Sequence, residues 1–421
     1  MAPMRYDFPT PAAPPPMPNV LLVAPWFSDV QKHCVQCFLD LPGARVGVLT
    51  QEPPERVPPA IAARLAACER VDDAGQSSQL VAAAEKVRAQ WGRIDRLEGY
   101  LEMLQVPIAE ARDALGVDGM GAEVARNFRD KNRMKDVLRQ AGVPVARQAL
   151  VRGEADARAF VATVGYPIVL KPLAGFGARN TQRVTDDASL QQALAALQPT
   201  AEQPAQAEEF VQGEEHTFES VVIDGKVVWS STTAYVPRPL QVLENPWMQY
   251  ALILPREQQP PHAEAFAATN AKALAALGVR HGLTHMEWFL RDDGTFVVSE
   301  VGARPPGANI MPLLRAAHGA DPWAAWAKLM IERRWEFPER RFAAGTVFLR
   351  AKDGGQTVRS VEGVAAMQQA LGPAFFEMKM PQPGQPRSTH YEGDGFVLVH
   401  HPRTDGVVKA LRAVLDTVTI R

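Results

Sequence analysis

Cysteine is scarce in this sequence. The chain has 421 residues and only three cysteines, Cys34, Cys37 and Cys68. So small and odd a number cannot form a disulfide framework, and it favours a reducing compartment. Residues 33–37 read HCVQC, which could be a redox pair or half of a metal site, but the second pair of ligands is missing from the sequence. We therefore expect the first two cysteines to be small buried side chains on a helix, as free cysteine often is.

Long apolar runs are also absent. No stretch approaches the roughly 20 residues that span a membrane, and the start, MAPMRYDFPTPAAPPPMPN, lacks the apolar centre of a secretory signal. We expect a soluble, cytoplasmic protein without a membrane partner. Residues 1–18 are rich in proline and alanine and carry little that could be buried, so we expect a disordered tail, with order beginning at Asn19.

Neither sign of charge predominates. Lys and Arg number 45 and Asp and Glu number 47, which gives a formal net charge of -2. No global field therefore favours nucleic acid or an anionic membrane surface, and we expect small-molecule partners. With 46% hydrophobic and 22% charged residues, the chain is ordinary globular material of roughly two to four packed units.

The N-terminal part alternates strands and helices. Residues 19–25 (NVLLVAP) and 44–50 (ARVGVLT) indicate short buried strands, and 80–91 (LVAAAEKVRAQW) indicate a helix. This alternation predicts a parallel α/β unit over about 19–125. The loop after the first strand, PWFSD, lacks a G-x-G-x-x-G pattern, so we expect no dinucleotide site there.

The rest of the chain mixes helices with antiparallel hairpins. Residues 129–144 predict an amphipathic helix, and 166–172 predict a strand that leads into a glycine loop at 173–181. The dipeptide Asp224-Gly225 is a strong hairpin signal. The remaining predictions are a helix over 263–277, a hairpin over about 285–301, a helix near 322–335, and strands with one final helix (405–416) over 343–421.

Two glutamates are predicted to face each other in the second hairpin. Asp293-Gly294 is a favoured centre for a two-residue turn, and counting outward from it sets Glu287 opposite Glu300. Opposed side chains lie on one face with Cβ atoms roughly 5 Å apart, where two carboxylates repel each other. Such an oxygen-lined pair suits Mg²⁺ or Mn²⁺. In the alternative, the turn is longer, the register shifts, and one carboxylate faces water.

An anion-binding pattern follows the second of these glutamates. The segment SEVGARPPGA, residues 299–308, ends an apolar strand at Glu300 and places Arg304 four residues later. Arginine is a permanently charged planar fork that suits phosphate or carboxylate. Gly302 and Gly307 permit close backbone approach. We interpret the segment as a platform for a metal-bound phosphate.

Lys171 is the candidate that meets this phosphate. It ends the apolar run IVL, where a lysine is costly to bury unless it meets an anion. The alternative is that it simply reaches the surface. The loop that follows contains Gly175 and Gly177, whose backbone N–H groups could close over phosphates, although a plain turn is the more common explanation of such a pair.

Four segments together resemble the ATP-grasp superfamily, in the order and spacing of that family. They are RDKNRMKDVLRQAGVP (129–144), YPIVLKPLAGFGARNT (166–181), EEFVQGEEHTFES (208–220) and HMEWFLRDDGTFVVSEVGARPPG (285–307). The resemblance implies an ATP-grasp fold, mixed α/β and α+β in class. Its parts would be a Rossmann-like N-terminal α/β domain (19–125), the ATP-grasp domain (126–335) with a lid over about 147–210, and a C-terminal α+β extension (336–421).

The resemblance also implies site residues, with ATP and Mg²⁺ or Mn²⁺ as cofactors. Carried over by position, Lys131 and Lys171 resemble the two lysines that hold ATP phosphates, and the 173–181 loop resembles the mobile flap above them. Glu287 and Glu300 match the acidic metal ligands. Many members carry Asn where this chain has Gly302, which leaves the number of metal ions open.

The nucleotide hinge is carried over in the same way. Glu208, Glu209 and Val211 resemble the segment that reads adenine. Glu215 resembles the ribose ligand, with Glu214 as its alternative.

The ending E-V-G-A-R-x-x-G, with T-H-x-E upstream, looks most like the carboxylate–amine ligases that join amino acids into dipeptides. The activity implied is formation of an amide or peptide bond through an acyl phosphate, with release of ADP and phosphate. Arg304 would neutralise the transferring phosphoryl group and the oxyanion. The alternatives are ATP-dependent carboxylation or formylation, and a non-catalytic ATP-binding scaffold.

Substrate residues are less well indicated. Tyr235, Arg238 and Trp247 lie in an aperiodic stretch and could line an acid or amine pocket, or could merely pack on the domain. His285 stands beside the metal strand and could orient substrate. Small side chains at Gly307 and Ala308 predict room for a bulky substrate side chain. The partners implied are a small-molecule carboxylate and an amine, and a homodimer is left open.

Overall fold

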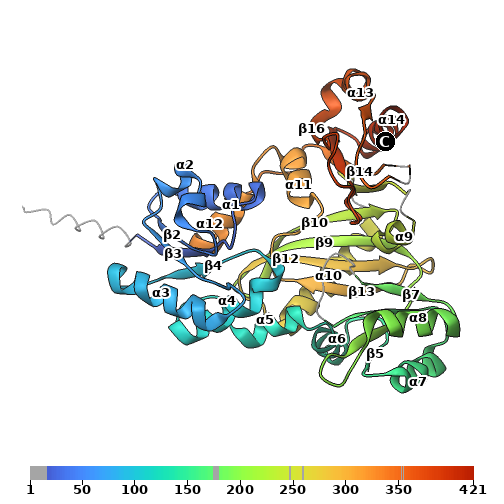
Figure 1. Ribbon diagram of the computed structural model, residues 1–421, viewed down its shortest axis with the longest axis horizontal. Coiled ribbons are helices and arrows are strands. Elements are labelled where there is room, and N and C mark those ends of the chain that lie inside the picture. Colours follow the sequence, from blue (N-terminus) through green and yellow to red (C-terminus); the bar gives the residue numbers. More distant parts are fainter. Residues whose placement is uncertain (1–16, 174–179, 246–247, 258–259, 352, 354) are drawn as a thin grey trace, which may run out of the picture.

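The computed structural model is organised around an eight-stranded antiparallel sheet (Figure 1). The structure describes residues 17–173, 180–245, 248–257, 260–351, 353 and 355–421, with only the backbone of 260–263. The strand order is β13-β12-β9-β10-β11-β14-β17-β16. The bounds are β9 (Glu214–Ile223), β10 (Lys226–Val236), β11 (Tyr250–Leu254), β12 (Gly282–Leu290), β13 (Phe296–Gly302), β14 (Ala343–Leu349), β16 (Phe375–Lys379) and β17 (Gly395–His401).

The N-terminal part is a parallel sheet flanked by helices, as the sequence predicts. Its order is β3-β2-β1-β4, and every adjacent pair is parallel. Branched and long aliphatic side chains fill its core, because strands buried on both faces favour them. Its elements are β1 (Asn19–Val23), α1 (Asp29–Leu39), β2 (Arg45–Thr50), α2 (Pro59–Ala62), β3 (Ala67–Arg70), α3 (Ser77–Trp91), β4 (Arg96–Glu98) and α4 (Gln105–Leu115).

Two further helices lead to a small antiparallel sheet. Asp130 begins the second of them by accepting hydrogen bonds from the backbone N–H groups of Asn132 and Arg133, and Gly142 stops it with φ of 69°. The sheet has the order β5-β8-β6-β7. The elements are α5 (Ala122–Arg129), α6 (Lys131–Gln140), β5 (Gln148–Val151), α7 (Glu154–Val164), β6 (Ile168–Pro172), β7 (Gln182–Val184), α8 (Asp187–Leu197) and β8 (Ala205–Glu209).

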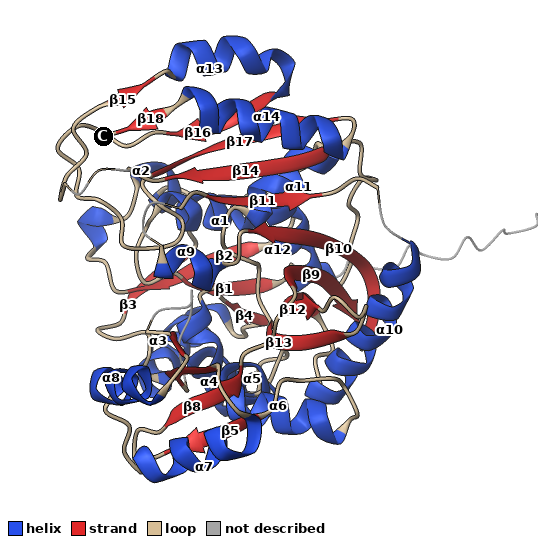
Figure 2. Cartoon of the chain, turned by 90° about the vertical axis from the view of Figure 1, so that its right-hand side faces the viewer, coloured by secondary structure: helices blue, strands red, loops and turns tan. Residues whose placement is uncertain are grey.

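Three of the C-terminal strands, β14, β17 and β16, extend the large sheet. β14 pairs with β11 from Tyr250↔Phe348 to Leu254↔Ala344, and β17 and β16 follow. Figure 2 shows this continuous surface above the small sheet. The sequence analysis expected one helix here, and that was wrong, because α13 (Val364–Leu371) precedes α14 (Thr404–Thr417). A two-stranded sheet joins β15 (Val361–Glu362) to β18 (Thr419–Ile420).

Helices cover both faces of the extended sheet. α13 and α14 bury Met367, Leu411 and Val414 against one face. The other face packs against α11 (Ile310–His318), which the sequence patterns did not predict, and α12 (Pro322–Glu332), which also contacts α1. The remaining helices are α9 (Pro239–Glu244) and α10 (Pro260–Leu277). The four-part division of the chain stays a prediction.

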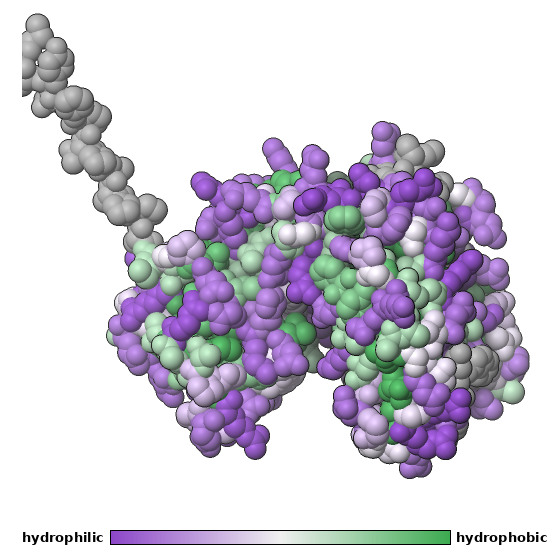
Figure 3. All heavy atoms as spheres, turned by 90° about the horizontal axis from the view of Figure 1, so that it is seen from above, coloured by the Kyte–Doolittle hydropathy of each residue, from purple (hydrophilic) through white to green (hydrophobic). Residues whose placement is uncertain are grey.

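The surface is hollowed between the N-terminal unit and the side that carries the C-terminal helices (Figure 3). Most of the predicted N-terminal tail lies outside the described residues. Over the part of the chain that the structure describes, no helix is long and apolar enough to cross a membrane.

Candidate active site

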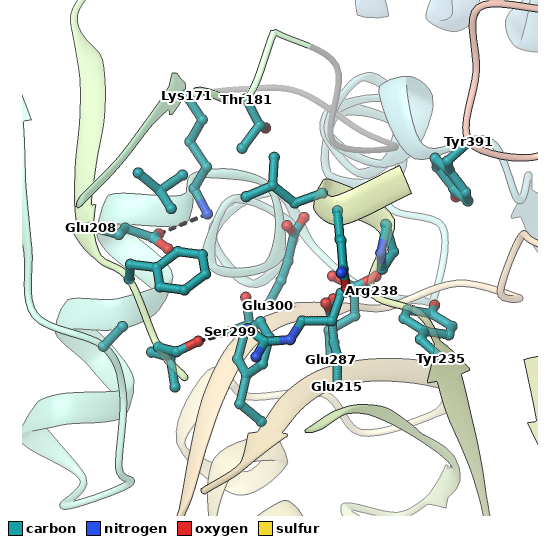
Figure 4. A pocket seen from close by; sticks show the side chains of 18 of the residues that line it. Lys171, Thr181, Glu208, Glu215, Tyr235, Arg238, Glu287, Ser299, Glu300 and Tyr391 are labelled. Atoms are coloured by element: carbon teal, nitrogen blue, oxygen red, sulfur yellow. Dashed lines mark hydrogen bonds and ion pairs between the residues drawn. The ribbon is translucent and has the colours of Figure 1, made fainter. Parts of the chain in front are cut away.

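A cavity of about 520 Å³ opens between the small sheet and the large sheet. Figure 4 shows Lys171 and Glu208 at one end, Tyr235 and Tyr391 at the other, and Glu300 between them. Of the residues singled out in the sequence, the cavity wall includes Lys131, Lys171, Glu208, Glu209, Val211, Glu215, Tyr235, Arg238, His285, Glu287, Glu300, Arg304, Gly307 and Ala308. The predicted Gly175, Gly177 and Trp247 lie outside the described residues.

Glu287 and Glu300 are directly paired across β12 and β13, as the sequence predicts. The predicted two-residue turn was wrong, because Arg291 pairs with Thr295 and leaves three residues in the loop. That extra residue shifts the register by one. A β-bulge at Ser299, between the pairs Trp288↔Val298 and Glu287↔Glu300, shifts it back. Two opposite irregularities thus place both carboxylates in the cavity.

Cations compensate this carboxylate pair. Lys131, the first residue of α6, forms an ion pair with Glu300. The Nε2 atom of His285 lies 3.6 Å from a Glu287 oxygen, and its Nδ1 lies 2.9 Å from a carboxylate oxygen of the fully buried Glu219. Burial lowers the pKa of His285, but these two carboxylates outweigh it and raise the pKa to about 9. For Glu287, burial raises the pKa and the hydrogen bond and charge of His285 more than reverse this, so its pKa is lowered.

A second cluster holds Glu208 between two lysines. One Glu208 oxygen lies 2.8 Å from the Lys171 ammonium and 2.5 Å from that of Lys135. Burial raises the pKa of Glu208, but the two lysines overcome this and lower the pKa to about 2. Burial also lowers the pKa of Lys135 to about 8, against the pull of the glutamate. Sequence reasoning missed Lys135, although it lies one helical turn after Lys131.

A third cluster joins the N-terminal unit to the loop after β13. Glu102 forms ion pairs with Arg304 and, at 2.6 Å, with Arg129. Burial raises the pKa of Glu102, but the two guanidinium groups dominate and lower the pKa to about 2. The sequence analysis missed Glu102, because nothing in the chain marks a partner 202 residues from Arg304.

The cavity wall is apolar around Val211. Ala146, Val211 and Val297 form a small buried cluster against Phe289. Arg238 donates a hydrogen bond to the Val211 carbonyl oxygen at 3.0 Å. All four apolar side chains also line the cavity, as is common where a small-molecule site binds an apolar group.

Glu215 and Glu214, the two candidates for the ribose ligand, differ in whether they reach the cavity. Glu215 lies in the cavity wall, whereas Glu214 is exposed and lies 3.3 Å from His216. Burial, reinforced by the charge of Glu287, raises the pKa of Glu215 to about 8.

Comparison with known proteins identifies the fold. Residues 135–310 match the family model described as ATP-grasp domain. The chain has an ATP-grasp domain. Around it, the structure resembles the crystal structure of L-amino acid ligase from Bacillus licheniformis, with a TM-score of 0.75 at 20% identity over 96% of this chain and 98% of that chain. The likeness in fold therefore covers nearly the whole chain, beyond the residues that the family model matches.

Curated relatives of this chain include ligases of amino acids. Alanine–anticapsin ligase of Bacillus subtilis (strain 168) is 26% identical over 261 residues, which cover 56% of this chain and 53% of the relative. The L-arginine-specific L-amino acid ligase of Bacillus subtilis is 26% identical over 228 residues, which cover 53% of this chain and 54% of the relative. The matched part thus spans about half the length of these curated relatives.

The donor set of the ATP-grasp cavity fits a hard divalent cation. Glu287 and Glu300 offer carboxylate oxygens from one face of a rigid hairpin, and Mg²⁺ takes one or two such ligands beside water and phosphate. In this structure, Lys131 forms an ion pair with one of these carboxylates, that of Glu300. A Cβ atom built on Gly302 meets only ordinary contacts, the nearest being 3.7 Å from a Glu102 oxygen. A Cβ atom would therefore fit at this position.

Proposed function

We propose that this chain is an ATP-dependent carboxylate–amine ligase, which forms an amide or peptide bond between amino-acid-like substrates and releases ADP and phosphate. The observation that carries the proposal is the meeting of the carboxylate pair, the lysines and Arg304 in one cavity that also has an apolar end. The names of the relatives, which are amino acid ligases, support it.

We place the base of the nucleotide against the apolar part of the cavity wall beside Val211. Glu215 would accept hydrogen bonds from the ribose, and Lys131 and Lys171 would neutralise the phosphates. Both lysines already hold carboxylates, so phosphate oxygens replace partners of the same charge. This exchange limits the cost of desolvating the ammonium groups.

Glu287 and Glu300 would hold Mg²⁺ or Mn²⁺, which when bound neutralises charge on the phosphates. His285 fixes the Glu287 carboxylate by a cationic contact, supported from behind by Glu219. The hairpin thus supplies positioning more than covalent chemistry.

The reaction proceeds in two displacements. An oxygen of the substrate carboxylate forms a bond to the γ-phosphorus of ATP, and the bond from that phosphorus to the β,γ-bridging oxygen breaks, which releases ADP. The amine nitrogen then bonds to the carbonyl carbon of the acyl phosphate. The carbon–oxygen bond to phosphate breaks, phosphate leaves, and the nitrogen loses a proton. Arg304 would stabilise the transferring phosphoryl group and the oxyanion.

The substrates would lie at the end of the cavity that Tyr235 and Tyr391 line (Figure 4). A Cβ atom built on Gly307, which also lines the cavity, has no heavy atom within 4 Å, so the wall is open at this residue. We propose that it admits a bulky substrate side chain. Arg238 contacts the hinge, and we place it beside the nucleotide.

Hydroxylamine trapping tests the proposal. Purified protein is incubated with MgATP and hydroxylamine against a panel of single amino acids, and phosphate and hydroxamate are measured together. A ligase yields a hydroxamate with some amino acids, in proportion to phosphate. Phosphate release that requires bicarbonate or formate would indicate the carboxylation or formylation alternative, and nucleotide binding without turnover across the panel would indicate a scaffold.

A further inference from the structure

The HCVQC segment acquires a third partner in the folded chain. His33 and Cys37 lie one turn apart on α1, and both face Asp321, the N-cap residue of α12. The His33 Nε2 atom lies 2.7 Å from Asp321 Oδ2, and the Cys37 sulfur lies 3.6 Å from the same oxygen and 3.8 Å from that nitrogen. One nitrogen, one sulfur and one oxygen therefore converge from two helices.

These separations approach the edges of a tetrahedral zinc site. Zinc bonds of about 2.3 Å to sulfur and about 2.0 Å to nitrogen or oxygen give ligand-to-ligand distances of roughly 3.3–3.5 Å. The two distances from sulfur need to shorten by only a few tenths of an ångström, and the hydrogen-bonded pair must open. Side-chain exposures of 46% for His33 and 29% for Asp321 leave both free to adjust.

The carboxylate is already oriented for this role. Its Oδ1 atom accepts a hydrogen bond of 2.9 Å from the Trp323 N–H at the start of α12, which leaves Oδ2 directed at His33 and Cys37. Apolar packing holds the two helices together, with the rings of Phe38 and Trp326 5.5 Å apart. Such outer contacts fix the position of a metal ligand.

We propose that His33, Cys37 and Asp321 bind a zinc ion that links α1 to α12. A thiolate with an imidazole favours zinc over magnesium or calcium. Binding displaces the Cys37 thiol proton to solvent, and the imidazole binds through Nε2 with its proton on Nδ1. Water supplies the fourth ligand. None of the three side chains lines the ATP-grasp cavity, so the role is to stabilise the contact between the N-terminal unit and α12.

Cobalt substitution tests the ligands directly. The full chain is treated with a chelator and titrated with Co²⁺ alone, and the absorption of the thiolate-to-cobalt charge transfer is recorded. The band should saturate near one equivalent and disappear in Cys37→Ser. It should weaken in His33→Ala and in Asp321→Asn, which keeps an oxygen for the Trp323 N–H. Cys68→Ser is the matched control, because Cys68 is an exposed thiol elsewhere, and it should leave the band unchanged.

Thermal unfolding with Zn²⁺ supplies a second readout. At free zinc one hundred times the Kd, the unfolding equilibrium constant should fall about 100-fold in the wild type. It should fall much less in His33→Ala, and chelation should reverse the effect. If the Co²⁺ titration gives no thiolate band, the proposal is wrong. The same holds if the metal binds only at the carboxylates of the cavity, because such binding also gives no thiolate band. A band that survives Cys37→Ser also overturns the proposal.

Discussion

Two clusters of similar charge border the cavity, and they differ in their cations. Each centres on a buried glutamate between two cations, Glu208 between lysines and Glu102 between arginines. In both, the cations hold the pKa of the glutamate at about 2 against burial. The lysine cluster lies within the ATP-grasp domain, whereas the arginine cluster joins it to the N-terminal unit.

The difference follows from the chemistry of the two cations. Lysine is a compact charge on a flexible side chain and can exchange one anion for another, which suits a site where phosphates bind and dissociate. Arginine is a rigid fork that keeps its charge and geometry, which suits a site where charge develops during the reaction. We infer that Glu208 pairs with Lys135 and Lys171 in the absence of nucleotide and that the phosphates then replace it as a partner. Glu102, by contrast, would hold Arg304 in place both before and during the reaction.

Removing the centre of the lysine cluster should have the largest effect. Glu208→Ala leaves two ammonium groups buried near each other, and breaking a buried ion pair costs about 3–5 kcal/mol. We expect a loss of that size in the free energy of unfolding, measured by urea denaturation. Glu209→Ala is the matched control, because the side chains of its partners Arg147 and Arg291 are both more than a third exposed. Equal losses of unfolding free energy in both variants would contradict the view that Glu208 compensates the two buried lysines.

Removing Arg304 should impair turnover instead of nucleotide binding. Loss of a donor to an oxyanion typically costs about 10²–10³ in kcat, and we expect Arg304→Ala to show this while the Kd for ATP stays within about threefold. Both are measured by phosphate release and calorimetry. Arg129→Ala also breaks an ion pair with Glu102 but lies outside the cavity wall, so it should keep most of its turnover. Normal turnover of Arg304→Ala would exclude the role proposed for this arginine.

Acid should weaken both clusters together. The pKa of each central glutamate is about 2 in the fold and about 4.5 in the unfolded chain, so the unfolded state binds more protons between these values. Stability from each pair is therefore present above about pH 4.5 and is lost as the pH falls towards 2, with a slope of up to about 1.4 kcal/mol per pH unit per group. Glu102→Gln should flatten this slope by about one proton in urea denaturation across that range. An unchanged slope would show that Glu102 is not held ionised.

The smallest effect on stability is expected at Gly307, which belongs to neither cluster. Gly307→Ala adds a methyl group into open space, so stability should change by less than about 1 kcal/mol. Gly307→Leu should raise KM for bulky substrates by about tenfold or more and leave small ones unaffected. The comparison of KM across amino acids of increasing size checks this. A uniform rise in KM would place the substrate elsewhere.

The sequence predicted the elements that local patterns encode. Alternation of strands and helices predicted the N-terminal parallel sheet, and Asp224-Gly225 predicted the β9–β10 hairpin, where Ile223 pairs with Lys226. The prediction that Glu287 lies opposite Glu300 was correct, but it assumed a two-residue turn. The loop has three residues, and the bulge at Ser299 compensates the resulting shift in register. Neither the turn length nor the bulge is specified by local composition, because packing of the sheet selects both.

What could not be predicted depends on contacts between distant parts of the chain. Glu102 and Arg304 are 202 residues apart, and Asp321 lies 288 residues from His33. The missed helices α11 and α13 are short, at 9 and 8 residues, and their stability comes from the sheet that they cover. Lys135 is different, since its spacing from Lys131 was visible and its significance appears only once Glu208 lies beside it.

The ladder between β11 and β14 has a consequence for shortened forms of this chain. A protein that ended before Ala343 would leave β11 as an outer strand, with its N–H and C=O groups unpaired on one side. Tyr250, Leu252 and Leu254, which are now fully buried, would lie along that margin. An uncovered apolar strand is a template for pairing between molecules, so truncation at this point should favour self-association of the shortened chain.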